Sequence, residues 1–236
     1  MAESWMVEDR SAYYREIFDW MADRYVTQTI SVSWGRYPGW MDDMVRVVAE
    51  RPPDRLVDIG SGPGYFLSRL HDALPRVELT AVDVSPRMLD RVNVPATRHA
   101  EPFERWAPAH PKSYDTAIMS FLLRDLSDRP GAVRAVHDVL AAGGRFVLLE
   151  THRPVGLRGW GFDGYVHNIL PAWGDRGLTP DWSGTRDRAP YRWLSRTQRT
   201  WDRGREVPDW LSDAGFSHIE CRTRPDDVVV MWTAQA

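Results

Sequence analysis

The most informative segment of the chain is Val57-Asp58-Ile59-Gly60-Ser61-Gly62-Pro63-Gly64-Tyr65. Its apolar start predicts a short buried strand, because it lies between the break at Arg51-Pro52-Pro53-Asp54 and a run of glycines. Glycines that directly follow a buried strand permit a tight turn and let a ligand approach the backbone closely. A helix starting at Tyr65 would point the positive end of its dipole at that ligand. The stretch therefore predicts a site for an acidic or carboxylate-bearing ligand.

Two common phosphate-binding patterns do not fit this turn. A dinucleotide-binding fingerprint needs a third glycine where the chain has Tyr65, and a phosphate-binding loop needs a Gly-Lys-Ser or Gly-Lys-Thr sequence that is absent. Further along, Asp83 ends the next predicted strand, where a carboxylate can accept both hydroxyl groups of a ribose. The turn and Asp83 together predict a nucleoside ligand.

Strands and helices alternate on both sides of this turn. This alternation predicts an α/β fold with a mainly parallel sheet that helices cover on both faces. The predicted strands cover residues 55–59, 77–84, 114–120 and 145–150, and the predicted helices cover residues 65–73, 87–91 and 130–140.

The pattern divides the chain into four parts. Residues 1–50 predict an N-terminal helical cap, with amphipathic helices at 9–29 and about 40–49, and residues 51–151 predict the ligand-binding core. Residues 152–205 are rich in Gly, Pro, Trp and Arg with weak periodicity, which predicts an insertion that forms a lid. Residues 206–236 predict a helix at 207–214 and an antiparallel hairpin that completes the sheet.

The composition is that of a folded protein and restricts its partners. The chain has 236 residues, 43% hydrophobic and 27% charged, with a net charge of −3, so it lacks the basic surplus that nucleic-acid binding needs. The single cysteine, Cys221, excludes an intramolecular disulfide and agrees with a reducing compartment. No apolar run reaches membrane-spanning length, and no His, Cys, Asp and Glu residues have metal-ligand spacing. We therefore expect a cytoplasmic protein without a metal, with a homodimer left open.

Tryptophan is the unusual residue of this chain. Twelve are present, and only Trp106 lies between residues 51 and 150. Tryptophan offers large, rigid contact area to flat rings, so the distribution favours a planar aromatic ligand under the cap and the insertion. The alternative is that these side chains fill the core of an irregular cap. The others are Trp5, Trp20, Trp34, Trp40, Trp160, Trp173, Trp182, Trp193, Trp201, Trp210 and Trp232.

The glycine-rich turn resembles motif I of class I S-adenosylmethionine-dependent methyltransferases, and the resemblance extends to one branch. Several further motifs look like those of the ubiquinone/menaquinone-biosynthesis C-methyltransferase family. They are Ile17-Phe18-Asp19 to Tyr25, Ser33-Trp34-Gly35, Ser120-Phe121-Leu122-Leu123-Arg124-Asp125-Leu126, Asp138-Val139-Leu140, Gly143-Gly144-Arg145 to Glu150, Tyr191-Arg192-Trp193-Leu194 and Ala214-Gly215-Phe216.

The resemblance implies a Rossmann-like sheet of seven strands, the last one antiparallel, with S-adenosylmethionine (SAM) lying across the strand ends. It places the methionine end of SAM at the motif I turn, the ribose at Asp83 and the adenine beside His99 and Met88. The positions expected to bind SAM are Tyr25, Asp58, Gly60, Ser61, Gly62, Pro63, Gly64, Asp83, Val84, Met88, His99, Ala100, Glu101 and Ser120.

The chain departs from the family pattern mainly on the acceptor side. Tyr65 replaces a polar residue, Leu122 a glycine, Asp125 an asparagine and His152 a serine, while His99 replaces an acidic or amide residue beside the adenine. A neutral imidazole still offers one acceptor nitrogen. The departures leave SAM as the expected cofactor and put a quinone acceptor in doubt.

Four residues are candidates for the chemistry of methyl transfer. His152 follows the fifth strand and His167 lies in the insertion, where either could take the proton of a phenol or enol. Each could equally be an ordinary hydrogen-bonding histidine. Tyr25 is expected at the mouth of the site. Arg124, with its neighbour Asp125, follows the fourth strand, where it could anchor an acceptor oxygen or form only an ion pair.

These observations predict a SAM-dependent methyltransferase that acts on a small planar aromatic or polyketide-like acceptor, with carbon methylation favoured over oxygen methylation, in the tailoring of a natural product. The alternative is a methyltransferase of the menaquinone or ubiquinone pathway. An alternative of another class is a SAM-binding protein that has lost transfer and acts as a cyclase, isomerase or regulator. The motifs serve the methyl donor, so they do not separate the acceptors.

Overall fold

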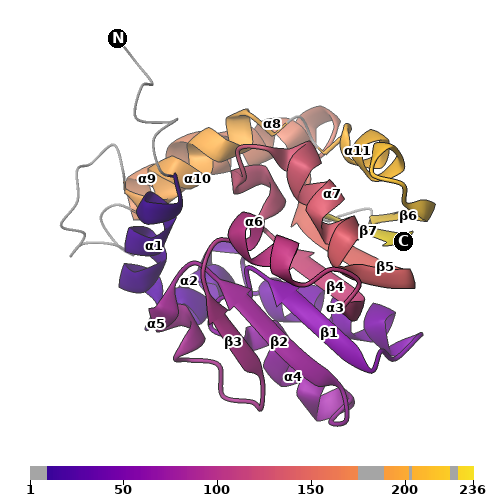
Figure 1. The fold of residues 1–236 in the computed structure, drawn as a ribbon. Helices are drawn as coiled ribbons and strands as arrows, with labels where there is room; N and C mark the ends of the chain where they lie inside the picture. The colour runs from indigo at the N-terminus through magenta and orange to yellow at the C-terminus, as the bar shows by residue number, and fades with distance from the viewer. Residues whose placement is uncertain (1–9, 175–188, 202–203, 224–227) are drawn as a thin grey trace.

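The computed structural model describes residues 10–174, 189–201, 204–223 and 228–236. Within them the chain forms one seven-stranded sheet in the order β3-β2-β1-β4-β5-β7-β6 (Figure 1). The strands are β1 (Arg55–Ile59), β2 (Glu78–Asp83), β3 (Thr97–Ala100), β4 (Tyr114–Ser120), β5 (Leu140–Thr151), β6 (Ser217–Thr223) and β7 (Val229–Gln235).

The pairing of the strands is mainly parallel. β1 pairs in parallel with β2 and β4, β2 with β3, and β4 with β5, whereas β7 is antiparallel to both β5 and β6. The carboxyl ends of β1, β2, β4 and β5 consequently share one edge of the sheet, where open α/β folds bind ligands. The Rossmann-like fold class with an antiparallel last strand is confirmed.

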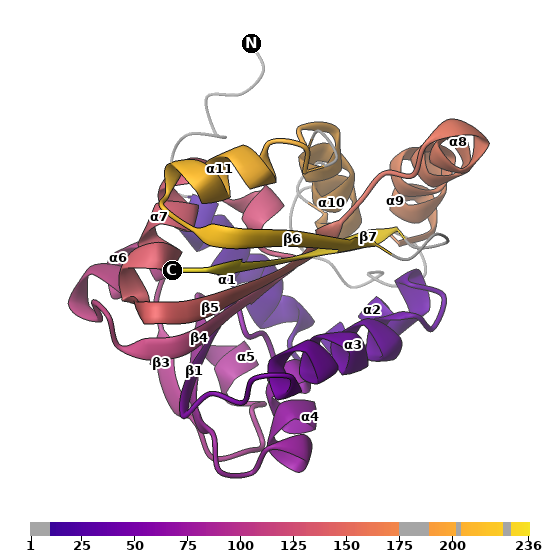
Figure 2. The same cartoon turned by 90° about the vertical axis from the view of Figure 1, so that its right-hand side faces the viewer.

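Helices cover both faces of the sheet, as Figures 1 and 2 show. One face packs against α6, α7 and α11, and the other packs against α3 and α4. The helices on the two faces are α3 (Tyr37–Ala49), α4 (Tyr65–Ala73), α6 (Phe103–Trp106), α7 (Arg129–Val139) and α11 (Val207–Asp213). Helix α3, part of the expected cap, thus packs on the sheet itself, with Met41 and Met44 fully buried.

A third apolar cluster holds the cap together away from the sheet. It joins α1 (Arg10–Met21), α5 (Pro86–Leu89) and α10 (Pro190–Arg199) through Tyr14, Ile17, Met88 and Trp193. The ring of Trp193 meets those of Tyr13 and Tyr14 edge-on at centroid distances of 4.7 and 5.7 Å. Segments far apart in the sequence therefore close over the same edge of the sheet.

The insertion is helical where the structure describes it. A helical segment runs through α8 (Gly156–Gly164), the π-helical turn η4 (Tyr165–Ile169) and α9 (Leu170–Trp173), and α10 follows later in the chain. Its sequence lacks a clear period because glycines are frequent in α8 and because the π-helical turn shifts the register. The weak periodicity therefore concealed regular structure.

Two other boundaries differ from the sequence expectation. The helix expected over 9–29 is divided into α1 and α2 (Tyr25–Val32), with non-helical φ and ψ at Arg24. Strand β3 was not predicted, because it is a four-residue edge strand whose side chains are mostly exposed, so it has no apolar pattern. The hairpin turn expected near Pro225 lies outside the described residues.

None of the helices described here is both long and apolar enough to cross a membrane.

Candidate active site

The glycine-rich turn has the backbone geometry that its sequence predicts. Gly60, Gly62 and Gly64 have φ values of 73°, 55° and 75°, in the left-handed region that side chains disfavour. The backbone N–H groups of Gly60 and Ser61 donate to the carbonyl oxygen of Val82 at 2.8 and 3.2 Å. The turn is thereby fixed against the end of β2, with α4 starting directly after Gly64.

Two polar atoms under this turn are buried without a hydrogen-bond partner. They are Oδ1 of Asp58 and Oγ of Ser61, on side chains that are 1% and 8% exposed. Burial, reinforced by the nearby Asp83 carboxylate, raises the pKa of Asp58 to about 8. A buried carboxylate of this kind is stabilised by a cation or a hydrogen-bond donor from a ligand.

Asp83 connects the turn to the next helix. Its Oδ2 accepts from the N–H of Gly62 and its Oδ1 from the N–H of Ser85, both at 2.8 Å. Burial raises the pKa of Asp83 to about 6, against the opposing effect of these two hydrogen bonds. Each carboxylate oxygen keeps a second lone pair, so Asp83 can still accept from a ligand hydroxyl.

A small cleft lies beside the turn, across the ends of β1, β2 and β4. Its volume is about 120 Å³, below the usual size of a ligand pocket, because Leu122 covers Gly60. Cδ2 of Leu122 lies 2.8 Å from the position that a Cβ on Gly60 would take. The lack of a side chain at residue 60 therefore lets Leu122 approach the turn this closely.

Most of the positions expected to bind the cofactor line this cleft. They are Tyr25, Gly60, Gly62, Asp83, Val84, Met88, Glu101 and Ser120. Asp58, Ser61, Pro63 and Gly64 form the turn beneath it, and Ala100 ends β3. His99 packs instead against Trp106 and His110, at ring-centroid distances of 5.7 and 5.4 Å, and burial lowers its pKa. Pro102 and Phe103 also line the cleft and carried no signal in the sequence, whereas Leu126 belongs to the family-like motif after β4.

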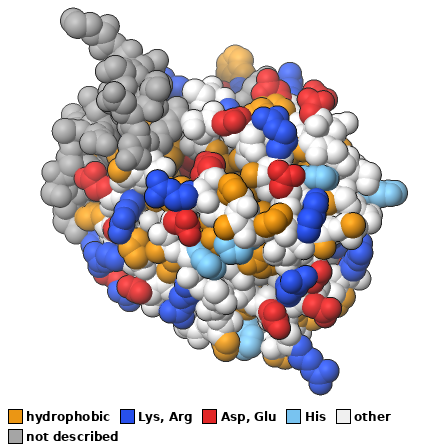
Figure 3. All heavy atoms as spheres, in the orientation of Figure 1, with side chains coloured by type: hydrophobic (Ala, Val, Ile, Leu, Met, Phe, Trp, Pro, Cys, Tyr) orange, Lys and Arg blue, Asp and Glu red, His pale blue; other side chains and the backbone are white. Residues whose placement is uncertain are grey.

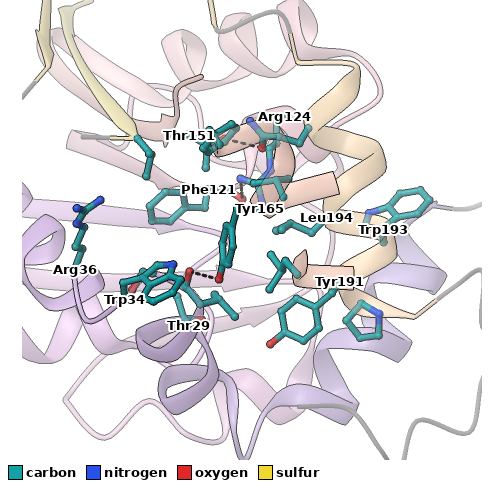
Figure 4. A pocket seen from close by; sticks show the side chains of 18 of the residues that line it. Thr29, Trp34, Arg36, Phe121, Arg124, Thr151, Tyr165, Tyr191, Trp193 and Leu194 are labelled. Atoms are coloured by element: carbon teal, nitrogen blue, oxygen red, sulfur yellow. Dashed lines mark hydrogen bonds between the residues drawn. The ribbon is translucent and has the colours of Figure 1, made fainter. Parts of the chain in front are cut away.

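A large cavity of about 940 Å³ adjoins the small cleft (Figure 4). It lies between α1, α2, the insertion and the sheet edge, and its wall is mainly apolar and aromatic. Tyr165 donates to the carbonyl oxygen of Val32 at 2.9 Å, and Tyr191 donates to Oε1 of Gln28 at 3.2 Å, which fixes both rings. The aromatic members of the wall are Tyr14, Phe18, Tyr25, Trp34, Trp40, Phe121, Phe162, Tyr165, Tyr191 and Trp193.

The cleft and the cavity share one wall. Tyr14, Phe18, Tyr25, Phe121 and Asp125 line both of them. Cε1 of Tyr25 lies 3.8 Å from the position of a Cβ on Gly62, which places the tyrosine ring over the motif I turn. Phe121 has a φ of 57°, a left-handed conformation that is costly for this residue type and concentrates at functional sites. The shared wall is where two bound molecules would meet.

Arg124 lies in the floor of the large cavity within a buried ionic network. Its Nη1 lies 3.0 Å from Oε2 of Glu150 and its Nη2 lies 3.6 Å from Oδ2 of Asp125. The exposed fractions of these three side chains are 6%, 0% and 8%. Nε of Arg124 is buried without a hydrogen-bond partner. The guanidinium group is therefore held at the cavity with one donor still available.

Tyr25 keeps its proton at neutral pH. Burial raises the pKa of its phenol to about 12, although the Arg124 cation opposes the shift. A group with such a pKa donates a hydrogen bond rather than acting as a base near neutrality. Tyr25, expected at the mouth of the site, is thus a hydrogen-bond donor between the cleft and the cavity.

Neither of the two candidate histidines is among the residues that line the cleft or the cavity. His152 donates its backbone N–H to the carbonyl oxygen of Val228 at 2.6 Å, next to β7. Nδ1 of His167 lies 2.9 Å from Oγ of Ser195, on α10, and burial lowers the pKa of His167. Their roles in proton transfer stay predictions, whereas Asp125, Arg124 and Tyr25 all face the cavity.

Tryptophan is not the residue that shapes the cavity. Of the described tryptophans outside 51–150, Trp34, Trp40 and Trp193 line it, while Trp201 and Trp232 fill the core behind the sheet. Trp160 and Trp173 are exposed, and Trp5 and Trp182 lie outside the described residues. The inference from tryptophan count to a planar ligand therefore loses its main support. The aromatic wall consists mostly of tyrosine and phenylalanine.

The described residues contain no group of three or more His, Cys, Asp or Glu side chains that could hold a metal ion.

A parallel sheet with a glycine turn after β1, an acidic residue ending β2 and an antiparallel last strand defines a class I SAM-dependent methyltransferase. Solved structures agree on the fold. A SAM-dependent methyltransferase from Thermotoga maritima matches with a TM-score of 0.62 at 17% sequence identity, covering 94% of this chain and 98% of that one. The two chains therefore share this fold.

The chain belongs to the ubiE/COQ5 methyltransferase family, whose sequence model matches residues 6–235. Among curated relatives, the UbiE ubiquinone/menaquinone biosynthesis C-methyltransferase of Paracoccus denitrificans is 26% identical and covers 91% of this chain and 87% of its own. The demethylmenaquinone methyltransferase of Symbiobacterium thermophilum is also 26% identical and covers 89% and 86%. The family predicted from the sequence motifs is confirmed.

The residues at the turn fit SAM. The unpartnered Oδ1 of Asp58 and Oγ of Ser61 lie where the amino-acid end of the cofactor is expected, and Asp83 retains acceptor capacity for a ribose. At Gly62 a Cβ would meet only the ring of Tyr25, at 3.8 Å. When bound, SAM supplies an electrophilic methyl group on a sulfonium centre.

The raised pKa of Asp58 predicts a pH-dependent stability. The carboxyl group ionises near pH 4 in the unfolded chain and only near pH 8 in the folded protein, so the folded protein binds more protons between these values. The free energy of unfolding of the protein without SAM is therefore expected to fall as the pH rises from 4 to 8. Thermal unfolding across this range measures the effect.

Asp58→Asn, which mimics the protonated carboxyl, is expected to flatten this dependence and to raise the melting temperature at pH 8. Asp72→Asn, on the exposed side of α4, serves as the control and should leave the curve unchanged. An Asp58→Asn protein with the pH dependence of the wild type would show that Asp58 is not buried as a neutral acid.

Proposed function

We propose that this protein transfers the methyl group of SAM to a ring carbon of a quinol-type aromatic acceptor that carries an apolar substituent. The observation that carries the proposal is the aromatic-lined cavity of about 940 Å³ that shares Tyr25, Phe121 and Asp125 with the cofactor cleft. The curated relatives, one named as a ubiquinone/menaquinone biosynthesis C-methyltransferase and the other as a demethylmenaquinone methyltransferase, support the same choice.

The size and the lining of the cavity suit a flat ring with an apolar extension. Drug-sized ligands occupy pockets of about 300–1,000 Å³ that are mostly apolar with a few polar groups, which is the pattern here. The polar groups of the floor are Arg124, Asp125 and Thr151, so the oxygen-bearing ring would lie there and the substituent would extend towards α8 and α9. A polyketide-like acceptor remains a prediction with less support, because the tryptophans that favoured it mostly lie elsewhere.

The side chains at the shared wall divide the work of the reaction. The Asp125 carboxylate takes the proton of a ring hydroxyl, which raises the electron density at the neighbouring ring carbon. Arg124 and the phenol of Tyr25 donate hydrogen bonds to the resulting oxyanion. The ring carbon then bonds to the methyl carbon as the methyl–sulfur bond breaks and S-adenosylhomocysteine leaves. The ring carbon loses its own proton to solvent, which restores the aromatic ring, and the ring oxygen regains a proton from Asp125. The aromatic wall excludes water and holds the ring carbon in line with the methyl group, and such positioning supplies much of the acceleration of a displacement reaction.

Tyr25→Phe tests the part of this scheme that concerns the oxyanion. Because Tyr25 stays protonated, removing its hydroxyl is expected to lower kcat by about 10- to 100-fold, with the Kd of SAM changed by less than about twofold. Steady-state kinetics and calorimetric titration of SAM give the two values. Tyr13→Phe, in the same helical cap but outside both cavities, is the matched control, and equal losses in both variants would remove Tyr25 from the reaction.

The proposed function is tested with purified protein, methyl-labelled SAM and demethylated quinols of different tail length. Label in a product that resists hydrolysis and shows a substituted ring carbon by NMR is the expected result. Label on an oxygen would correct the position of transfer. Label only on polycyclic phenols would favour the tailoring function, and tight SAM binding without transfer to either acceptor class would favour a protein that does not use the methyl group.

A further inference from the structure

The exposed large apolar side chains of the described residues come from two segments that border the large cavity. We call them the rim patch; they are Trp34, Val155, Leu157, Trp160, Ile169 and Trp173, with exposed fractions from 45% to 87%. Monomeric soluble proteins rarely expose such a group together, and when they do it marks an interaction site. The patch therefore needs a partner.

The rim patch comes from two parts of the chain that contact each other through Tyr165. Trp34 follows α2, and its ring lies 5.7 Å from that of Tyr165 in η4. The hydroxyl of Tyr165 donates to the carbonyl oxygen of Val32, which attaches the same turn to the end of α2. The other members lie on or beside the segment from α8 to α9, at the outer edge of the molecule in Figure 2.

The patch is continuous with the interior of the cavity. Trp34 and Ile169 are 76% and 58% exposed, yet both also line the cavity, as do Phe162 and Tyr165 on the inner side of the same helical segment. A rigid protein partner on the patch would close this mouth. A fluid apolar phase would cover the patch and leave the mouth open to an apolar acceptor.

The charge at the rim favours phospholipid. Arg36 is exposed and lines the mouth, on the same side of the cavity as Trp34 in Figure 4. Arg36 makes no ion pair with a described residue. Asp163, the acidic residue of α8, is paired with Arg153. Trp together with Arg is the combination that proteins place at the level of lipid headgroups, with the guanidinium group on the phosphates.

On the face of the molecule shown in Figure 3, acidic and basic side chains are interspersed and no large area carries one sign of charge. The segment itself also suits an interface. Helix α8 has the sequence GLRGWGFDG, in which glycines weaken the helix in water but an apolar surrounding strengthens its hydrogen bonds. Gly161 and Gly164 have open space where a side chain would be, so packing within the protein does not explain them.

We infer that the rim patch docks the protein onto the surface of a phospholipid bilayer, with α8 lying in the interface and the large cavity open to the lipid. This inference rests on the proposed function in one respect, namely that an apolar acceptor would enter the cavity from the bilayer. Binding to vesicles itself is independent of methyl transfer, and the two can fail separately.

The test is flotation of the full chain with phosphatidylcholine vesicles, with and without an anionic phospholipid. Leu157→Ser/Trp160→Ser removes two exposed side chains that do not line the cavity, and it is expected to lower the partition coefficient at least about tenfold. The matched control Leu157→Met/Trp160→Phe keeps the apolar area and should keep binding. Unfolding temperatures of both variants should equal that of the wild type, because both side chains are exposed.

Three results would overturn the inference. One is a wild-type protein that stays out of the lipid fraction. Another is unchanged flotation of the Leu157→Ser/Trp160→Ser variant. The third is a wild-type dimer that this variant converts to a monomer without any vesicle binding, since the patch would then join two copies of the chain. Without vesicles, the wild type and both variants should methylate a short-tailed, water-soluble quinol at the same rate. If the wild type does not methylate this quinol at all, the result counts against the proposed function and not against docking.

Discussion

Asp125→Asn is expected to lower kcat by about 100- to 1,000-fold while SAM binding stays within a few-fold of the wild type. The carboxylate lines both the cofactor cleft and the large cavity, and its side chain is 8% exposed beside the Arg124 cation. Removal of a general base of this kind costs about 10²–10⁴ in rate. An amide of the same shape keeps the packing and cannot take a proton.

The chemistry of the acceptor provides the control for this prediction. A phenol that ionises easily needs little help from a base, so the rate loss of Asp125→Asn should shrink steadily along a series of increasingly acidic quinols. A loss of the same size for every acceptor would mean that Asp125 only holds the structure. Asp90→Asn, exposed at the end of α5, should behave as the wild type throughout.

Arg124→Met is expected to destabilise the protein by about 3–5 kcal/mol, because it leaves the Glu150 carboxylate buried without its cation. Burial already raises the pKa of Glu150, and Arg124 is the cation that opposes this effect. Without Arg124 the pKa of Glu150 rises further, so the folded variant binds a proton and the loss is smaller at pH 5 than at pH 8. Urea unfolding of the wild type and the variant at pH 5 and pH 8 measures the loss of stability at each pH.

The double variant Arg124→Met/Glu150→Leu separates stability from function. Replacing both charges by apolar groups should restore most of the free energy of unfolding, because the uncompensated charge is gone. Methyl transfer should stay at least about 100-fold below the wild type, since no cation remains for the acceptor oxyanion. If activity returns together with stability, Arg124 acts only through the fold.

The cofactor side of this protein was predictable from local sequence. The turn from Gly60 to Gly64 needs positive φ values that glycine supplies, and Asp83 follows from the end of the next strand. Both depend on neighbours within a strand-turn-helix unit, which are close in the chain. The strands of the sheet were predicted for the same reason, with the exception of the short, exposed β3.

The acceptor side was decided by the tertiary structure. Tyr25, Asp125, Tyr165 and Tyr191 meet at one cavity although they are distant in the sequence, and no spacing rule connects them. His152 and His167 looked equally suitable by position, yet they do not line the cavity.

The glycine turn, the acidic end of β2 and the fold class follow from local sequence, since a backbone turn and the period of a buried strand depend on consecutive residues. Long-range packing set which side chains line the large cavity together and which apolar groups remain exposed. Trp201 and Trp232 are core residues, Trp193 lines the cavity, and Trp160 is exposed at the rim. The same residue type has three environments because burial depends on how helices pack against a sheet, and long-range packing sets that arrangement.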